Sequence, residues 1–425
     1  MGDANMVINF KKRALYIISI MLVLLLIIVH PDLLKIYCKY TYYEPVLIKK
    51  ISIPYNKNKS IEKVFAERHH ICSFIVDNDK IYAISCTQRL GGGNRSLLFA
   101  LDMNSGKEIW RMWPTRIRFK GVDYINYFSN LYFDKMNDRL FVLEPKPKEK
   151  PSYFYSIKAS TGEIIWKYPL SYNGKIFFDG DKLYLTDGSN FIKFDPDTGG
   201  IYEAYQMPFQ SYRIYSLSNY GRPFIIDGKL FAYCEEEQEL LIVNLDDISM
   251  NPIDPVTLRI KINEYILSSL VLDDNILYFS TTDKAMIAWD LSKNKKLWEY
   301  TEGGGTYYSP IIYKNSVIFY DERYGRSLIA ADKKTGEIKW DIEFNLDLST
   351  SMVIEDQTLF IAITDDKNPL ANLKETSYIC AINPNNGKVI WKFKAEDEVI
   401  SFKILNDKLY CSCIDGYLYI YRISN

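Results

Sequence analysis

A short unit of the form A-x-D-x-x-T-G-x-x-x-W recurs along this chain, and it constrains the fold more than any other feature. Five copies keep the spacing from the turn to the tryptophan: Ala100–Trp110, Ser156–Trp166, Ala288–Trp298, Ala330–Trp340 and Ala381–Trp391. A sixth copy, Phe194–Gly199, lacks the tryptophan. Asp and Thr side chains accept backbone N–H groups in tight turns, and Gly supplies a positive φ. Each unit therefore predicts a hairpin turn between two strands.

A second element, of the form D-K-L-Y, alternates with the first. Its apolar anchor falls at Tyr82, Phe141, Tyr184, Phe231, Tyr278, Ile318, Phe360 and Tyr410. The mean step of about 47 residues is typical of propeller blades with four strands each. We therefore expect an all-β, eight-bladed β-propeller of four-stranded antiparallel blades, with seven blades as the alternative.

The last blade is one strand short. Strands are expected at Asn406–Ser412 and Tyr417–Arg422, and the sequence then ends. An unpaired sheet edge is a liability for a folded protein. We expect the strand-like stretch Val46–Pro54 to complete this blade and close the ring.

Charge and composition exclude several kinds of site. Lys and Arg number 52 against 53 Asp and Glu, which gives no reason to expect binding to nucleic acid or another polyanion. Only three histidines are present, so a multi-His metal site or a Ser-His-Asp triad is not expected. The seven cysteines fit no disulfide framework or zinc motif, and we interpret them as small buried apolar residues.

The N-terminal segment reads as a membrane anchor. A basic cluster at residues 11–13 precedes the apolar stretch Ala14–Val29, which is about one bilayer thick. No small-residue cleavage site follows. We expect a cytoplasmic N-terminus at 1–13, a transmembrane signal anchor at 14–34, a linker at 35–45 and an exported propeller at 46–425. The protein would be single-pass, with its propeller periplasmic or extracellular.

The tryptophan unit resembles the repeat of the PQQ-like, or quinoprotein-type, β-propellers, from about residue 46 to the C-terminus. A WD40 propeller, suggested by Trp289-Asp290, is the weaker alternative because its blades lack the Gly-x-x-x-Trp half. The resemblance implies that each tryptophan stacks on the glycine turn of a neighbouring blade. It assigns this structural role to Gly106, Trp110, Gly162, Trp166, Trp298, Gly336, Trp340, Gly387 and Trp391.

The resemblance also bears on catalysis. Quinone-dependent dehydrogenases of this family hold their cofactor beneath a disulfide between adjacent cysteines, with calcium ligands and a catalytic Asp. This chain has no adjacent cysteines, and without the residues that hold the quinone cofactor the protein has no oxidant. We therefore expect a non-catalytic member with no catalytic residues, no cofactor and no metal site.

Binding is expected on the propeller face that carries the variable connections, rather than on the face of short turns. Trp113, Arg116 and Arg118 are the preferred partner contacts, because exposed Trp and Arg are enriched at binding hot spots. In the alternative interpretation, the aromatic residues that follow belong to the first strand of the next blade. The first hypothesis is a membrane-anchored scaffold that binds protein partners in cell-envelope assembly. The alternatives are a glycan or small-ligand binding module and a quinone-dependent oxidoreductase.

Overall fold

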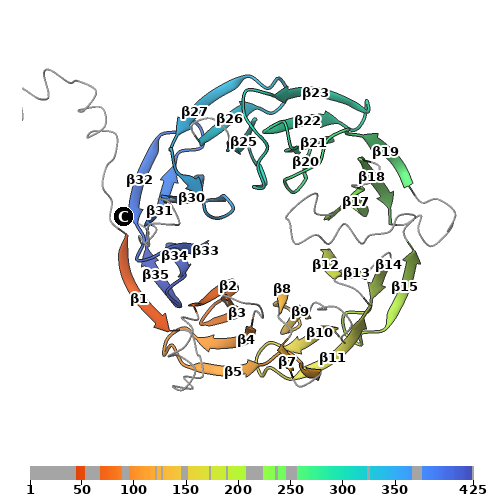
Figure 1. Cartoon of the computed structure of the whole chain (residues 1–425), viewed down its shortest axis with the longest axis vertical. Helices are drawn as coiled ribbons and strands as arrows, with labels where there is room; N and C mark the ends of the chain where they lie inside the picture. Colours follow the sequence, from red (N-terminus) through yellow and green to blue (C-terminus); the bar gives the residue numbers. More distant parts are fainter. Residues whose placement is uncertain are drawn as a thin grey trace, which may run out of the picture.

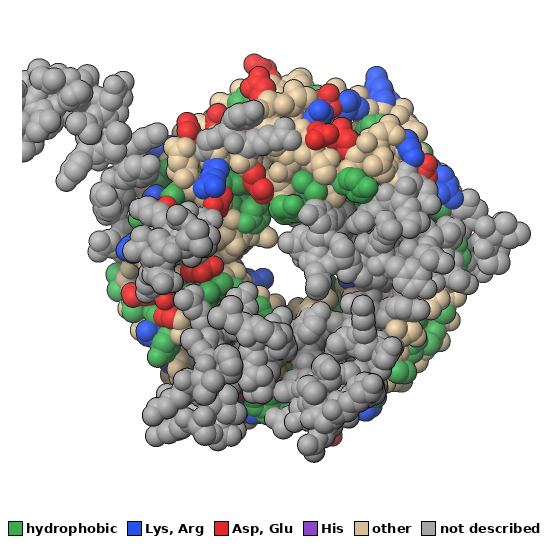
Figure 2. All heavy atoms as spheres, viewed as in Figure 1, with side chains coloured by type: hydrophobic (Ala, Val, Ile, Leu, Met, Phe, Trp, Pro, Cys, Tyr) green, Lys and Arg blue, Asp and Glu red, His purple; other side chains and the backbone are tan. Residues whose placement is uncertain are grey.

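A computed structural model describes residues 45–52, 68–88, 95–119, 122–125, 128–144, 152–171, 174–187, 190–206, 224–234, 238–245, 256–322, 326–365 and 376–423. These residues form eight antiparallel sheets arranged around a central axis, and one further two-stranded sheet (Figure 1). The eight-bladed, all-β prediction is confirmed, and the seven-bladed alternative is wrong. In the space-filling view along the same direction, an opening remains at the centre of the ring (Figure 2).

In blades 1 to 7 the strands follow one another in chain order from the channel outward. Blade 1 contains β2 (Arg68–Asp77), β3 (Lys80–Gln88), β4 (Arg95–Asp102) and β5 (Glu108–Met112). Blade 2 contains β8 (Ser129–Asp134), β9 (Arg139–Glu144), β10 (Ser152–Lys158) and β11 (Ile164–Leu170). Blade 3 contains β12 (Gly174–Asp179), β13 (Lys182–Asp187), β14 (Asn190–Phe194) and β15 (Ile201–Gln206), and blade 4 contains β16 (Phe224–Ile226), β17 (Lys229–Cys234), β18 (Glu239–Asn244) and β19 (Val256–Lys261).

Blade 5 contains β20 (Val271–Asp273), β21 (Ile276–Phe279), β22 (Met286–Asp290) and β23 (Lys295–Tyr300). Blade 6 contains β24 (Ile311–Tyr313), β25 (Ser316–Asp321), β26 (Ser327–Asp332) and β27 (Ile338–Glu343). Blade 7 contains β28 (Asp347–Leu348), β29 (Val353–Glu355), β30 (Thr358–Asp365), β31 (Thr376–Ile382) and β32 (Val389–Lys394). In blade 7, β28 and β29 both pair with β30.

Blade 8 closes the ring with strands from both ends of the chain. Its order is β1 (Val46–Ser52), β35 (Tyr417–Arg422), β34 (Lys408–Cys413) and β33 (Val399–Leu405). β1 is the outermost strand and pairs antiparallel with β35, from Val46 opposite Arg422 to Ser52 opposite Tyr417. The predicted closure by the N-terminal strand is confirmed.

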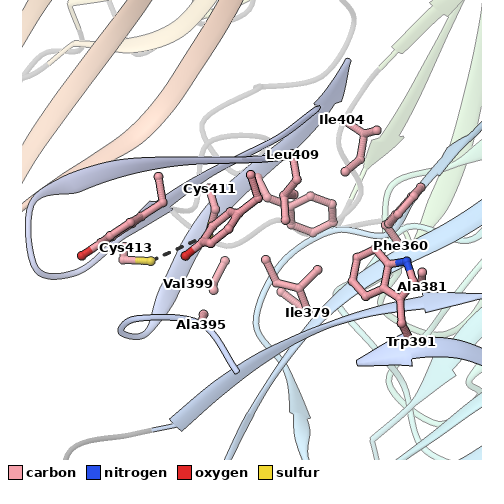
Figure 3. Packing of buried hydrophobic residues seen from close by; sticks show 14 residues of the cluster. Phe360, Ile379, Ala381, Trp391, Ala395, Val399, Ile404, Leu409, Cys411 and Cys413 are labelled. Atoms are coloured by element: carbon pink, nitrogen blue, oxygen red, sulfur yellow. Dashed lines mark hydrogen bonds between the residues drawn. The ribbon is translucent and has the colours of Figure 1, made fainter. Parts of the chain in front are cut away.

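The core lies between the blades. The second strands are almost wholly buried, because both of their faces pack on neighbouring sheets; all six residues of β25 are buried. Between blades 7 and 8, Phe360, Ile379 and Trp391 pack against Leu409 and Cys411 (Figure 3). Burial on two faces explains why these strands are nearly continuous apolar runs.

Every outermost strand carries a bulge at the same place, one residue before the position that holds tryptophan in five blades. The bulged residues are Ile48, Ile109, Ile165, Tyr202, Thr257, Leu297, Lys339 and Ile390. A bulge twists an edge strand and discourages pairing with another chain. The same bulge therefore protects the outer strand of each of the eight blades from pairing with another chain.

The interpretation of all cysteines as unpaired apolar residues is wrong for one pair. Cys72 and Cys86 form a disulfide across the β2–β3 hairpin, with Cα atoms 6.1 Å apart. The register places His70 opposite Cys86, and the irregularity of β2 lies between Ile71 and Ser73. The two cysteines thus meet as diagonal neighbours, which residue spacing alone does not reveal. Cys234, Cys380, Cys411 and Cys413 are buried, as expected.

The predicted membrane anchor lies outside the described residues. Within the part of the chain that the structure describes, no helix has the length and hydrophobicity needed to cross a bilayer.

Candidate functional site: the blade junctions and the loop face

The connections divide the ring into two faces. Tight turns join the first strand of each blade to the second and, in blades 1 to 3 and 5 to 7, the third strand to the fourth. We call that side the turn face. The opposite side, which carries the connections from second to third strand and from blade to blade, is the loop face.

An aspartate orders the repeat turn in blades 1, 3, 5 and 6, and Asn383 takes its place in blade 7. In blade 6, the Asp332 carboxylate accepts hydrogen bonds from the backbone N–H groups of Lys334 (2.9 Å) and Thr335 (3.1 Å). The N–H of Gly336, at φ 77°, donates to the Asp332 carbonyl at 2.9 Å. These backbone donors, and then Lys339, lower the pKa of Asp332 to about 2. The turn is therefore most stable when this carboxyl group is ionised.

The tryptophans join successive blades at these turns. A Cβ atom built on Gly162 would lie 2.6 Å from Cδ2 of Trp110, so the indole lies directly on the glycine of the next blade. Gly199, Gly336 and Gly387 meet Trp166, Trp298 and Trp340 in the same way. Each indole Nε1–H also donates to the carbonyl that follows the turn's first residue: Trp110 to Ala159 (2.8 Å), Trp166 to Pro196 (2.9 Å), Trp298 to Lys333 (3.1 Å) and Trp340 to Pro384 (3.0 Å).

Lys49 takes the tryptophan position in blade 8. It pairs with Ile420 on the third strand, as Trp110 pairs with Ala100, and the bulged residue precedes it in both strands. Its Nζ donates to the Met103 carbonyl at 2.6 Å, the equivalent of the carbonyls that accept from the indoles, and also to the Asn104 carbonyl. A lysine thus makes the interblade hydrogen bond where the ring closes.

Gly106 and Trp391 lie next to the point where the ring closes, and their contacts differ from those of the other glycines and tryptophans of the repeat. Gly106 faces Ile51 of β1, with the nearest side-chain atom 3.8 Å from a built Cβ, instead of an indole. Trp391 packs against Phe360 and Phe393. No turn joins the third and fourth strands of blade 8, because β1 comes from the other end of the chain.

Ion pairs reinforce several junctions on the turn face. Lys333, the residue after Asp332, reaches back to blade 5 and contacts the carboxylates of Asp273 (2.5 Å) and Asp274 (3.1 Å). Hydrogen bonding to Asp273 is the main cause that raises the pKa of Lys333. Arg139 of blade 2 pairs with Asp197 of blade 3 at 2.6 Å. Neighbouring blades are therefore tied together by charge as well as by packing.

On the loop face, acidic residues at the ends of second strands hold the connections between blades. Glu144 is fully buried and accepts from the N–H of Thr115 (2.6 Å) and from the hydroxyl of Tyr155 (2.6 Å). Asp187 accepts from the N–H of Ser171 at 3.0 Å, and Asp321 from that of Gly304 at 3.0 Å. Sequence reasoning missed this element; the signal was an acidic residue ending an apolar second strand.

Two of the expected contact residues begin an element that no blade requires. β6 (Arg116–Phe119) and β7 (Val122–Ile125) pair only with each other, as a separate two-stranded sheet between blades 1 and 2. The first strand of blade 2 is β8; Tyr124 lies on β7, outside that strand, whereas Phe128 directly precedes β8 and is buried in the core, as the alternative interpretation expected. Trp113 precedes the hairpin and is 38% exposed, whereas the side chains of Arg116 and Arg118 lie outside the described residues.

The described residues provide no evident metal site. Among them, no group of three or more His, Cys, Asp and Glu side chains is arranged to hold an ion. Cys411 and Cys413 lie on one face of β34 with their Sγ atoms 3.7 Å apart, buried in the core between blades 7 and 8 (Figure 3). Burial of His70 lowers its pKa and favours the neutral imidazole.

Comparison with known proteins places these features in a family. The family model described as outer membrane protein assembly factor BamB matches residues 93–246 and 259–399, which is more than half of the chain. The chain belongs to this family of PQQ-like propellers. No curated protein sequence matches it.

Two solved structures share the fold of this chain. BamB from Moraxella catarrhalis aligns with a TM-score of 0.56 and 12% sequence identity, covering 89% of this chain and 98% of that one. The computationally designed Ika8 protein aligns with a TM-score of 0.59 and 10% identity, covering 89% and 100%. At such identities the likeness concerns the eight-bladed architecture alone.

Proposed function

We propose that this protein is a membrane-tethered, exported β-propeller that binds protein partners through its loop face and acts as a scaffold in cell-envelope assembly. The BamB family match supports the scaffold class and the envelope setting. The tether, the location and the binding face are our inference from the sequence and from the described surface.

The β6–β7 hairpin carries the proposal. Blades 1 and 2 are complete without it, so ring stability does not explain its presence. Its connection to the ring is fixed by the buried Glu144, which binds the backbone of Thr115, while Trp113 remains partly exposed beside it. A partly exposed tryptophan on a fixed support suits a binding hot spot, because little side-chain freedom is lost on association.

Export is supported by the disulfide. Disulfides such as Cys72–Cys86 persist in the periplasm and outside the cell and are rare in the reducing cytosol. An anchor at 14–34 with a basic cluster on its N-terminal side would place the propeller on that oxidising side.

We propose further that the protein is not an enzyme and needs no cofactor. The described thiols are buried, and burial is the main cause that raises the pKa of the Cys380 thiol to about 12. Cys411 and Cys413 are separated by one residue and face the core, so they do not form an adjacent pair above the channel. Purified protein should therefore show no change in melting temperature with pyrroloquinoline quinone and calcium; a saturable rise would overturn this part.

The binding face is tested by photo-crosslinking in native membranes. A photoreactive amino acid replaces Trp113 on the loop face or, as a control, Tyr202 on the turn side, which is 62% exposed. We expect discrete crosslinked proteins from position 113, lost when crosslinking follows detergent dissociation, and none in common from position 202. Equal products from both positions, or none from 113, would contradict the proposed face.

A further inference from the structure

The chain enters the ring on the turn face. β1 starts at Val46, opposite Arg422, and runs toward the loop face, where Ser52 pairs with Tyr417. Only about 16 residues separate Val46 from the apolar stretch that ends at Val29, a reach of roughly 50 Å when fully extended. If that stretch spans the bilayer, as proposed above, blade 8 is held near the membrane by its turn face.

Exposed apolar side chains gather in the sector that contains this entry point. Most of the large hydrophobic residues exposed in the described part of the chain belong to blades 8, 1, 2 and 3, on the turn side or the outer rim. They are Val46, Leu47, Ile48, Leu405, Ile109, Tyr132, Met136, Ile164, Ile165, Ile201 and Tyr202. An apolar sector of this kind calls for a partner that covers it.

Blade 2 contributes the most exposed of these side chains. Its first turn, between β8 and β9, is longer than the two-residue turns of the other blades, and it carries Met136 at 96% exposure. Asp134 fixes the turn by accepting from the N–H of Met136 (3.1 Å) and the Nδ2 of Asn137 (2.7 Å). Lys135 ties it to Asp77 of blade 1 at 2.6 Å. The turn thus holds a methionine out into solvent.

Beside Met136 lies a groove of about 790 Å³ between blades 2 and 3. Tyr132 and Phe178 lie in its lining with ring centroids 5.6 Å apart, and Tyr202 lines it as well, together with charged residues of both signs such as Asp181 and Lys182. Tyrosine is enriched at membrane–water interfaces, where its ring is apolar and its hydroxyl remains hydrated. Pairing with a further protein strand is disfavoured here, because the outer strands of blades 8, 1, 2 and 3 are all bulged.

We infer that the turn face of blades 8 to 3 rests on the lipid bilayer, with Met136 and the neighbouring rim in the headgroup–acyl boundary and the loop face directed away from the membrane. This inference rests on the proposed tether and adds the orientation in which the scaffold presents its partners. It explains why the long turn of blade 2 and most of the exposed apolar side chains fall in the sector where the chain enters.

Bimane fluorescence on the full-length chain tests the orientation. The chain is reconstituted into vesicles of phosphatidylethanolamine and phosphatidylglycerol in a Cys38→Ser background, since the described cysteines are buried or disulfide-bonded. Bimane is attached at Met136→Cys on the turn face or at Tyr265→Cys, a 49% exposed position on the loop face. Lipids with a doxyl group high on the acyl chain serve as quenchers.

We expect about a twofold loss of bimane fluorescence at position 136 and little change at position 265, because collisional quenching needs contact with the lipid region. Retention of the protein in alkaline carbonate separates the two proposals. Retention without quenching at 136, or with stronger quenching at 265, would overturn the orientation and leave the tether standing. Release by carbonate would overturn the tether and the orientation with it.

Discussion

Replacing Gly162 with alanine tests whether the interblade tryptophan contact stabilises the ring. Two costs are expected. An L-residue held at φ 77° costs about 1–2 kcal/mol. The new Cβ would lie 2.6 Å from Cδ2 of Trp110, whereas carbon atoms prefer roughly 3.5–4.0 Å, so the indole must move by about 1 Å. That movement strains its 2.8 Å hydrogen bond to the Ala159 carbonyl.

Overpacking of this kind costs about 1–3 kcal/mol, so Gly162→Ala should lower the free energy of unfolding by roughly 2–5 kcal/mol. Gly228→Ala is the matched control, because Gly228 has φ 68° and nothing within 4 Å of a built Cβ. It should cost only the backbone share, about 1–2 kcal/mol. Urea unfolding monitored by circular dichroism measures both variants.

A double-mutant cycle isolates the indole. In a Trp110→Ala background the clash is absent, so Gly162→Ala should cost no more than Gly228→Ala does in the wild type. If Gly162→Ala costs the same with and without the indole, or if the two glycine variants unfold alike, the tryptophan contact does not stabilise the junction and the reasoning fails.

Three further predictions concern closure, pH and the disulfide. Lys49→Met should remove about 1–2 kcal/mol from the free energy of unfolding by deleting the hydrogen bond to Met103, and an unchanged urea midpoint would contradict its docking role. The stability due to Asp332, whose pKa is lowered to about 2, is present above the free carboxyl value near 3.9 and is lost as the pH falls toward 2. Asp332→Asn should therefore melt closer to wild type at pH 2.5 than at pH 6. The Cys72→Ser/Cys86→Ser variant should lose about 2–3 kcal/mol, and a reducing agent should then have no further effect; continued sensitivity to reduction would point to another disulfide.

The fold could be predicted from sequence because its signals are local and repeated. A turn such as Asp332–Gly336 is specified by side chains that bond to their own backbone, whatever lies around them. The anchor residues of the second strands recur at blade spacing, and the missing strand of the last blade identified β1 as the closing strand. These features needed no knowledge of long-range contacts.

The candidate site was predicted less fully. Trp113 was recognised as a candidate from residue type, but the independence of the β6–β7 hairpin from blade 2 depends on strand pairing. The support from Glu144 joins residues 29 positions apart, and no local pattern marks such a pair.

What the sequence by itself determined is the repeating unit: its turns, its strands and its spacing along the chain. Only the tertiary structure decided what happens where the repeat is broken. No repeat pattern in the sequence marks Lys49 as the equivalent of a tryptophan. The register of β1 on β35 nevertheless places its Nζ within hydrogen-bond distance of the Met103 carbonyl. Cys72 and Cys86 meet because a hairpin register makes them diagonal neighbours. Local side-chain chemistry encodes turns, whereas contacts between distant segments exist only once the ring has closed.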